Sequence, residues 1–372
     1  MTDFIPVSEP LLTGNEKRYV NQCLETAWIS SEGPFVTDFE ERFAAKVGRR
    51  FGIAVCNGSA ALQVAVFALE LGEGDEVIFP TFTIISCAAA ILRCGARPVV
   101  VECDPATWNM DVARIEAKIT PQTKAIMPVH TYGLPVDMDP LLALAERYGL
   151  KVIEDAAEMI GQTYNGRPCG SFGDLSAFSF YANKHVTTGE GGMVVTDSEP
   201  LAARCRDLRN LCFQPGRRFV HEDLGWNFRM GNMQAALGLA QLEQLDEHVA
   251  RKRWIGERYT ALLGNLQGID LPLPRTAYAE NIYWVYGVVL GDAIALDAEA
   301  AMQALNRRGI GTRPFFWPMH EQPVLRKMGY FGGESCPVAE NLARRGFYLP
   351  SGATLTEEQI SRVAVSLGEV LS

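Results

Sequence analysis

Short apolar segments alternate with helical patterns through the first two thirds of the chain, and this alternation constrains the fold more than any other feature. The expected strands are residues 51–55, 76–80, 97–102, 124–130, 150–156, 176–181 and 192–197. Between several of them, residues 59–72, 84–95, 112–119 and 138–149 have apolar side chains at helical spacing. Strands that are apolar on both faces and alternate with helices form a mostly parallel sheet with helices on both sides. The sequence therefore predicts an α/β fold.

The last third of the chain has a different pattern, which predicts a second and smaller domain. Helical segments around 233–262 lead into an expected strand within 281–292, and a final helix is expected from about Glu357. We therefore expect a large α/β domain at residues 1–250, with an N-terminal arm, and a small α+β domain at 251–372. The helical region near residue 250 can bridge both parts.

Composition excludes several classes of protein. The net charge is −10, so a nucleic-acid-binding surface is not expected. The nine cysteines contain no CxxC pair, which indicates reduced thiols in a cytoplasmic protein. The five histidines have no metal-ligand spacing, so we predict no metal site. The longest uncharged stretch, residues 77–92, is too short for a membrane-spanning helix, so no membrane association is expected.

Two charged residues follow expected strands, where ligands of open α/β sheets gather. Asp155 comes directly after an apolar strand, and Lys184 lies on a short polar loop after another. A buried carboxylate requires a cationic or hydrogen-bonding partner, and a desolvated lysine can attack an aldehyde. Taken alone, each has an ordinary explanation: a helix cap or internal ion pair for Asp155, and a solvated loop lysine for Lys184.

A third element of the pattern is a turn that can bind phosphate. Gly58 allows a tight strand-to-helix turn, and Ser59 can cap the helix that follows while its amides face an anion. Ser179 can add a hydroxyl donor, although an N-cap and a strand serine are the ordinary explanations. Together the lysine, the acid and the turn predict a pyridoxal phosphate site, in which they meet the cofactor's aldehyde, ring nitrogen and phosphate.

The whole chain resembles the fold-type I pyridoxal phosphate enzymes that aminate nucleotide-linked keto sugars. The resemblance is carried by "CNGSAALQVA", "GDEVIFPTFT", "IEDAAE", "NFRMGNMQAALGLAQL", "GIGTRPFFWPMHEQP" and above all "GSFGDLSAFSFYANKHVTTGEGGMV". It implies an aspartate-aminotransferase-like fold, pyridoxal 5′-phosphate as cofactor with pyridoxamine 5′-phosphate between half-reactions, and L-glutamate as amino donor. It also implies GDP-4-keto-6-deoxy-D-mannose as the acceptor, a homodimer with shared active sites, and a product that enters the O-antigen of lipopolysaccharide.

The resemblance also assigns roles to residues that would surround the cofactor. Lys184 matches the lysine that forms a Schiff base and carries protons. Asp155 matches the partner of the ring nitrogen, and Glu158 matches a position near the ring hydroxyl. Ile84 stands where the family usually has an aromatic ring, so apolar contact would replace stacking at that position.

The remaining assignments concern the phosphate and the substrate. Gly58, Ser59 and Ser179 match the phosphate cradle, and Asn227 matches a residue that reaches the phosphate in the neighbouring subunit. Arg229, Arg313 and His320 match residues on the sugar-nucleotide side.

Other functions stay open at this point. The chain can aminate a dTDP- or UDP-linked 3-keto or 4-keto sugar, or it can be a cofactor-dependent sugar 3-dehydratase. In that branch a histidine replaces the reactive lysine, whereas Lys184 keeps the lysine here, and we expect the adjacent His185 to be an exposed loop residue. A non-catalytic cofactor-binding regulator is disfavoured because no basic appendage is present. A plain dinucleotide-binding enzyme is disfavoured because no GxGxxG follows the first strand.

Overall fold

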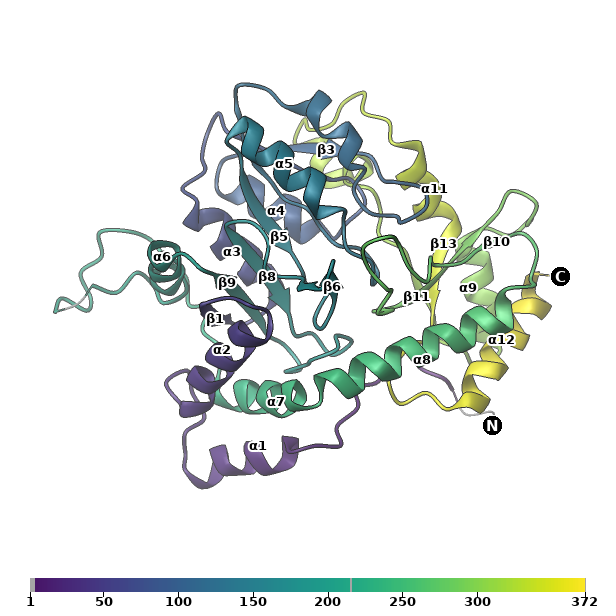
Figure 1. The fold of residues 1–372 in the computed structure, drawn as a ribbon, viewed down its shortest axis with the longest axis horizontal. Helices are drawn as coiled ribbons and strands as arrows, with labels where there is room; N and C mark the ends of the chain where they lie inside the picture. The colour runs from purple at the N-terminus through teal and green to yellow at the C-terminus, as the bar shows by residue number, and fades with distance from the viewer. Residues whose placement is uncertain (1–3, 215, 372) are drawn as a thin grey trace.

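The computed structural model describes residues 4–214 and 216–371. Its main sheet has seven strands in the order β1-β9-β8-β5-β4-β2-β3. These are β1 (Phe51–Val55), β2 (Glu76–Pro80), β3 (Arg97–Val101), β4 (Thr123–Ile126), β5 (Lys151–Asp155), β8 (Leu175–Ser179) and β9 (Gly192–Thr196). Among the described residues of this sheet, only β9 pairs antiparallel with its neighbours, and the other pairs of the sheet are parallel. The predicted α/β fold with a mostly parallel sheet is confirmed (Figure 1).

Helices cover both faces of this sheet because its strands are apolar on both sides. The helices on one face are α3 (Gly58–Ala68), α4 (Ile85–Arg93) and α6 (Glu199–Arg209). Those on the other are α2 (Pro34–Lys46), α5 (Met138–Tyr148) and α7 (Asn232–Glu243), with α1 (Glu16–Glu25) packed outside α7. In β1, Ile53 and Val55 face the first group while Ala54 faces the second, as the alternation of side chains along a strand requires.

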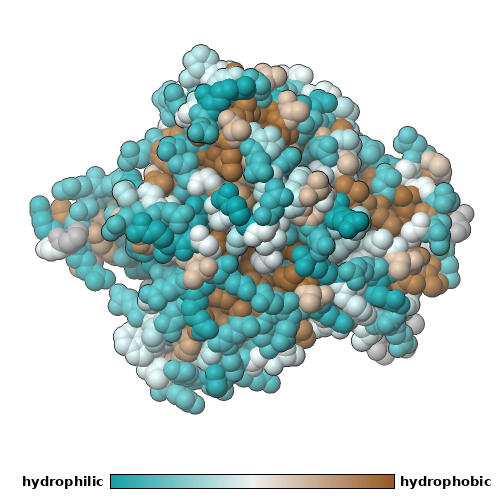
Figure 2. Space-filling model, in the orientation of Figure 1, coloured by the Kyte–Doolittle hydropathy of each residue, from teal (hydrophilic) through white to brown (hydrophobic). Residues whose placement is uncertain are grey.

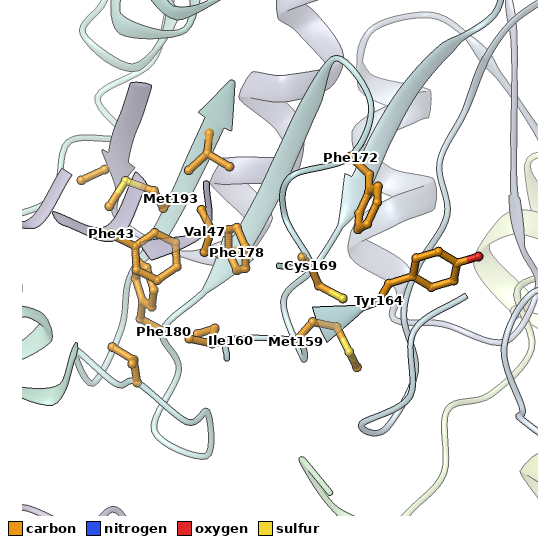
Figure 3. Close-up of a cluster of buried hydrophobic side chains, with 14 of the residues drawn as sticks. Phe43, Val47, Met159, Ile160, Tyr164, Cys169, Phe172, Phe178, Phe180 and Met193 are labelled. Atoms are coloured by element: carbon orange, nitrogen blue, oxygen red, sulfur yellow. The ribbon is translucent and has the colours of Figure 1, made fainter. Parts of the chain in front are cut away.

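Aromatic side chains anchor the strand that precedes the predicted reactive lysine. Phe43 of α2 packs against Phe178 and Phe180, with ring centroids 4.9 and 5.0 Å apart, and Met193 of β9 lies in the same cluster (Figure 3). All are fully buried, and burying one such side chain contributes about 1.5–3 kcal/mol. The end of β8 is therefore a rigid support for the loop that follows it.

Two of the expected elements are shorter than the sequence predicts. Residues 112–119 form two brief 3₁₀ helices, η1 (Val112–Arg114) and η2 (Glu116–Lys118), instead of one α-helix. Such a short segment is marginal as an isolated helix, and the side chain of Asp111 caps the amide of Ala113. The expected strand 124–130 ends at Ile126, because Pro128 has no amide hydrogen to donate to the sheet.

A second sheet follows in the last third, with four antiparallel strands in the order β10-β11-β13-β12. They are β10 (Ile269–Asp270), β11 (Tyr286–Leu290), β12 (Arg313–Pro314) and β13 (Gly346–Leu349). The helices of this last third are α8 (Leu245–Leu263), α9 (Ala298–Arg307), α10 (Pro323–Lys327), α11 (Pro337–Arg345) and α12 (Glu357–Leu371), with the turn η3 (Met319–Glu321). Met319 of η3 and Leu325 of α10 pack in the core of the main sheet. A small hairpin, β6 (Thr163–Tyr164) and β7 (Arg167–Pro168), lies in the chain between β5 and β8 of the main sheet.

Helix α8 runs from the end of α7 to the second sheet (Figure 1). Residues 250 and 251 lie within this helix, so the division into domains at that point stays a prediction. The N-terminal segment contacts the second sheet's side of the molecule, because Ile5 pairs with Ile310 and packs in the same core as Tyr286.

One segment extends away from the body of the molecule, between α6 and α7 (Figure 1). Its visible face is mostly hydrophilic (Figure 2), yet Phe219 and Leu224 on this segment are 81% and 85% exposed. Within residues 4–214 and 216–371, no helix has the combination of length and apolar character that crossing a membrane requires.

Candidate active site

The order of strands in the main sheet brings three predicted segments together. Strand β5 ends at Asp155, its neighbour β8 ends at Ser179, and the turn after β1 begins α3 at Gly58. A Cβ atom on Gly58 would lie 2.7 Å from the Cβ of Ser179. The start of α3 and the end of β8 are therefore in contact, and glycine is needed because no side chain fits between them.

The loop after β8 directs Lys184 toward two carboxylates. The Nζ atom of Lys184 lies 3.9 Å from Oε1 of Glu158, and the side chains of both residues are 9% exposed. The same Nζ lies 3.7 Å from the ring centroid of Trp284. Lys184 is thus a buried lysine between an acid and an aromatic face, and it is not a solvated loop residue.

Burial alters the acid–base properties of these groups. Burial lowers the pKa of Lys184, and the charges of Glu158 and Asp155 oppose this effect only in part. Burial raises the pKa of Glu158 to about 8, although the charge of Lys184 acts in the opposite direction. Both shifts favour the neutral forms, because desolvation outweighs the attraction between the two groups. A neutral amine is the form of lysine that attacks an aldehyde.

Asp155 is buried and held in a fixed orientation. Its Oδ1 accepts a hydrogen bond from the amide of Ala157 at 3.1 Å, and its Oδ2 accepts one from the thiol of Cys87 at 3.3 Å. Burial raises the pKa of Asp155, and the Ala157 amide opposes this. Among the described residues, no basic side chain lies within ion-pair distance of Asp155. A protonated ring nitrogen would supply that missing cation, so the carboxylate fits pyridoxal phosphate.

The neighbouring acid, Glu154, has a structural role on the other face of β5. It accepts hydrogen bonds from the ring of His130 at 2.9 Å, from two amides of the 170–172 loop and from Ser176. Since the amide of Val136 donates to Nδ1 of His130, the proton of the neutral ring lies on Nε2 and points to Glu154. This fully partnered pair leaves Asp155 as the acid available to a ligand.

The start of α3 differs from the prediction in one respect. The cap is Asn57, whose Oδ1 accepts from the amide of Ala60 at 2.8 Å, and it is not Ser59. Asn57 precedes the first helical residue, which is the geometry an N-cap requires. Ser59 is instead exposed, and its Oγ lies 2.7 Å from Oγ of Ser86 near the start of α4. The first amides of a helix have no acceptor within it, so this start fits a phosphate group.

Ile84 precedes α4 and is 47% exposed. Its position one turn before Cys87, which bonds Asp155, is consistent with the apolar contact predicted for it.

Asn227 and Arg229 lie on the segment beside β1. Arg229 forms an isolated bridge with Val55, and its guanidinium donates to the side chains of Asn227 and Asn210 at 2.9 and 2.7 Å. Asn227 is exposed. The structure therefore places this pair near the β1–α3 turn, with Asn227 open to a partner.

Arg313 lies on the second sheet, exposed on β12 and paired in register with Tyr348. Burial raises the pKa of Tyr348 to about 12, with a contribution from Glu158 and an opposing one from Arg313. The ring of Tyr348 also lies 6.3 Å from that of Tyr132, whose amide donates to Glu158. Arg313 thus lies on the strand next to Tyr348, which is near the residues that contact Glu158.

Two histidines lie elsewhere than the sequence suggests. His320 is 1% exposed, and its ring nitrogens contact Thr81 Oγ1 at 2.7 Å and Glu340 at 3.1 Å. Both nitrogens therefore have protein partners, which argues against direct contact with a substrate. The expectation that His185 is exposed is wrong: it is 3% exposed, its Nε2 lies 3.2 Å from the Ile282 carbonyl, and burial lowers its pKa to about 3.

A buried lysine that faces carboxylates at the strand ends of a mostly parallel sheet is typical of enzymes that use pyridoxal phosphate. The chain belongs to the DegT/DnrJ/EryC1/StrS aminotransferase family, whose family model matches residues 10–368. It is 46% identical to GDP-perosamine synthase of Caulobacter vibrioides over 371 residues. The aligned region covers 99% of this chain and 98% of that protein.

Two further relatives bear on the chemistry. The chain is 38% identical to UDP-N-acetyl-3-dehydro-alpha-D-glucosamine 3-aminotransferase of Acidithiobacillus ferrooxidans, over 99% of this chain and 95% of that protein. A solved structure of Spr1654 from Streptococcus pneumoniae, in its PLP form, has a TM-score of 0.91 at 26% identity and covers 99% of this chain and 98% of its own.

Several contacts of the site have no clear signal in the sequence. Cys87 lies in a helical run where a buried cysteine is ordinary, and Trp284 lies in an apolar segment about a hundred residues after Lys184. The amide of Tyr132 reaches Glu158 only through the path of the 130–134 loop. Such partners become visible only when the chain is folded.

Proposed function

We propose that this enzyme is a sugar aminotransferase that transfers the amino group of L-glutamate to carbon 4 of GDP-4-keto-6-deoxy-D-mannose, which yields GDP-perosamine. The observation that carries the proposal is the buried lysine beside two carboxylates in a chain 46% identical to a GDP-perosamine synthase. Pyridoxal 5′-phosphate, when bound, supplies an aldehyde that accepts an amine and a ring that withdraws electrons, and it alternates with its pyridoxamine form.

The residues around Lys184 would divide the work as follows. Lys184, whose pKa burial lowers, would bond to the cofactor's aldehyde and move a proton at the sugar carbon. Asp155 would hold the proton of the ring nitrogen, in the orientation that Ala157 and Cys87 impose. Glu158 would keep a proton near the ring hydroxyl, and Ile84 would cover the ring face.

The phosphate would be held where two segments meet. Gly58 and Ser59 would donate amides from the start of α3, and Ser179 would add its hydroxyl. Asn227 would act on the phosphate bound in a second subunit, which is supported by its exposure beside the β1–α3 turn.

Charged side chains would bind the substrates. Arg229 and Arg313 are the candidates for the carboxylates of glutamate and the diphosphate of the sugar nucleotide, because both guanidinium groups can bind these anions through paired hydrogen bonds. His320 would act indirectly, by holding the segment after β12 against Thr81.

We further propose a homodimer with shared sites in the cytoplasm, whose product serves the O-antigen of lipopolysaccharide. The exposed Phe219 and Leu224 on the projecting segment support association with a second subunit. All nine cysteines lie in the described part of the chain and are free thiols, as a reducing compartment favours.

A second candidate is amination at carbon 3 of a UDP-linked keto sugar. The 38% identity to a UDP-sugar 3-aminotransferase over nearly the whole chain favours it as the alternative. The two reactions use the same cofactor chemistry and differ in how the sugar lies over the cofactor.

A product assay tests the proposal. Purified protein with isotope-labelled L-glutamate is offered GDP-4-keto-6-deoxy-D-mannose and, separately, UDP-linked 3-keto sugars, and mass spectrometry identifies the labelled amino sugar. We expect labelled GDP-perosamine, and we expect Lys184→Ala to lower its rate of formation on the order of 10³-fold. Borohydride reduction followed by peptide mapping should label position 184. Labelled product from the UDP sugars alone would favour the second candidate, and a label elsewhere would refute the site.

A further inference from the structure

Helix α8 holds the loop that carries Lys184. The Nδ1–H of His248 donates to the carbonyl of His185 at 2.9 Å, directly after the lysine. The indole N–H of Trp284 donates to the carbonyl of Asn183 at 3.1 Å, directly before it. The backbone on both sides of Lys184 is therefore fixed from outside its own loop.

Lys252 lies one turn after His248 on the same face of α8. Its Nζ donates to the carbonyl of Trp284 at 2.8 Å and to the carbonyl of Ser351 at 2.6 Å. Because the ring of Trp284 contacts Nζ of Lys184, α8 reaches the reactive lysine by two routes: directly through His248, and through Trp284 by way of Lys252.

Lys252 is a buried cation whose position is not explained by packing alone. It is 4% exposed, and in the described part of the chain no carboxylate forms an ion pair with it. An apolar side chain would fill this position without desolvating an ammonium group. Burial lowers the pKa of Lys252 to about 7, and the charge of Lys184 contributes to this. A lysine here is useful mainly because it donates to two carbonyls at once.

The space beside these groups is small. Asn183, Lys184, His248 and Lys252 line a cavity of about 20 Å³, which is close to the volume that one or two water molecules need. The lysine loop and α8 are therefore packed closely together, with space for little more than water between them.

We propose that His248 and Lys252 are positioning residues, which hold Nζ of Lys184 in front of Glu158 and the bound cofactor. The inference rests on the proposed function, since it concerns the lysine to which that function assigns the chemistry. Neither residue touches the substrate; each acts through the backbone or through Trp284.

Paired variants test this inference in the full-length, cofactor-loaded protein. Lys252→Met keeps the length of the side chain and removes its donors, and Lys17→Met on the exposed face of α1 is the matched control. His248→Leu removes the donor to the His185 carbonyl, whereas His248→Asn retains a donor in nearly the same place. For each variant we would measure kcat and KM for the keto sugar, the absorbance spectrum of the bound cofactor with its pH titration, and the temperature of unfolding.

We expect Lys252→Met and His248→Leu to lower kcat on the order of ten- to a hundredfold with little change in KM, because a displaced reactive group slows the chemical step. The midpoint of the spectroscopic pH titration should shift in the same variants. His248→Asn should recover most of the rate, and Lys17→Met should match the wild type.

The inference is overturned if both variants keep the wild-type spectrum and kcat, or if they lose activity only in proportion to the unfolded fraction. If Lys252→Met does not fold, the comparison of His248→Leu with His248→Asn decides the question. Failure of the proposed function is a different result: the wild type itself would then form no amino sugar and carry no borohydride label at position 184.

Discussion

Oε1 of Glu158 lies 3.9 Å from Nζ of Lys184. Burial raises the pKa of Glu158 and lowers the pKa of Lys184. A carboxylic acid with a pKa of about 8 keeps its proton near neutral pH, so it can donate a hydrogen bond to a phenolate oxygen of the cofactor. The amine of Lys184 meanwhile remains free of a strong ion pair. A close and fully charged pair would instead make the lysine a poor nucleophile.

This arrangement predicts a pH dependence of stability. Below its ordinary pKa of 4.5, Glu158 is protonated in both the folded and the unfolded chain. As pH rises, the unfolded chain loses this proton first, so the stability that the neutral acid contributes declines until the folded pKa of about 8 is passed. The expected loss for this one proton is about 1.4 kcal/mol per pH unit within that window.

Glu158→Gln should remove this loss. In the cofactor-free protein, the free energy of unfolding of the variant should fall less steeply than that of the wild type between about pH 5 and about pH 8, measured by urea denaturation. Glu146→Gln, on an exposed position of α5, is the control and should keep the wild-type slope. Equal slopes in wild type and Glu158→Gln would show that Glu158 ionises normally.

At the scale of elements, the site depends on the contact between the start of α3 and the end of β8. Asn57 caps the helix, and Gly58 allows the approach of Ser179. The rigid core beneath β8, built on Phe43 and Phe178, holds this junction in place (Figure 3).

Gly58→Ala should damage the phosphate site more than it damages the fold. The added Cβ would lie 2.7 Å from the Cβ of Ser179, so the two elements must separate at a cost of about 1–3 kcal/mol. We expect the dissociation constant for pyridoxal phosphate to rise at least about tenfold, measured by absorbance titration. Gly72→Ala is the matched control, since nothing lies within 4 Å of the added atom. Unchanged cofactor affinity in Gly58→Ala would argue against the predicted cradle.

At the scale of the whole molecule, helix α8 connects parts that are distant in the sequence. It runs from α7 to the second sheet, and it contacts the loop that carries Lys184 through His248 (Figure 1).

The segment between α6 and α7 projects from the body of the molecule (Figures 1 and 2). That segment carries exposed apolar residues and leads to Asn227. Its position is consistent with a site that a second subunit completes.

Mixing two inactive variants tests the shared site. Lys184→Ala and Asn227→Ala should each be nearly inactive alone, because every site of either homodimer lacks one residue. After subunit exchange, about half of the dimers are mixed and one of their two sites is intact, so about a quarter of the wild-type activity should return. If Lys184 and Asn227 act within one chain, no activity should return.

Much of the fold follows from local pattern. The strands of the main sheet lie within a residue or two of the apolar runs, apart from β4, and Gly149 ends α5 in the left-handed conformation that a helix terminus favours. The segment 112–119 is a further departure, because its apolar spacing is helical but its length and the cap at Asp111 favour shorter turns.

The sequence also predicts that the candidate site residues lie together, since Asp155, Lys184 and the turn at Gly58 lie at or after the ends of strands that meet at one edge of a parallel sheet. Their roles in the reaction stay predictions. The identity of their neighbours was not predictable from the sequence. These neighbours come from segments far apart in the chain. Such contacts decide the burial of His185 and His320, the donors that orient Asp155, and the side chains that hold the lysine loop. Local periodicity records which face of an element is apolar, whereas the partner of a buried polar group is decided only when the elements pack together.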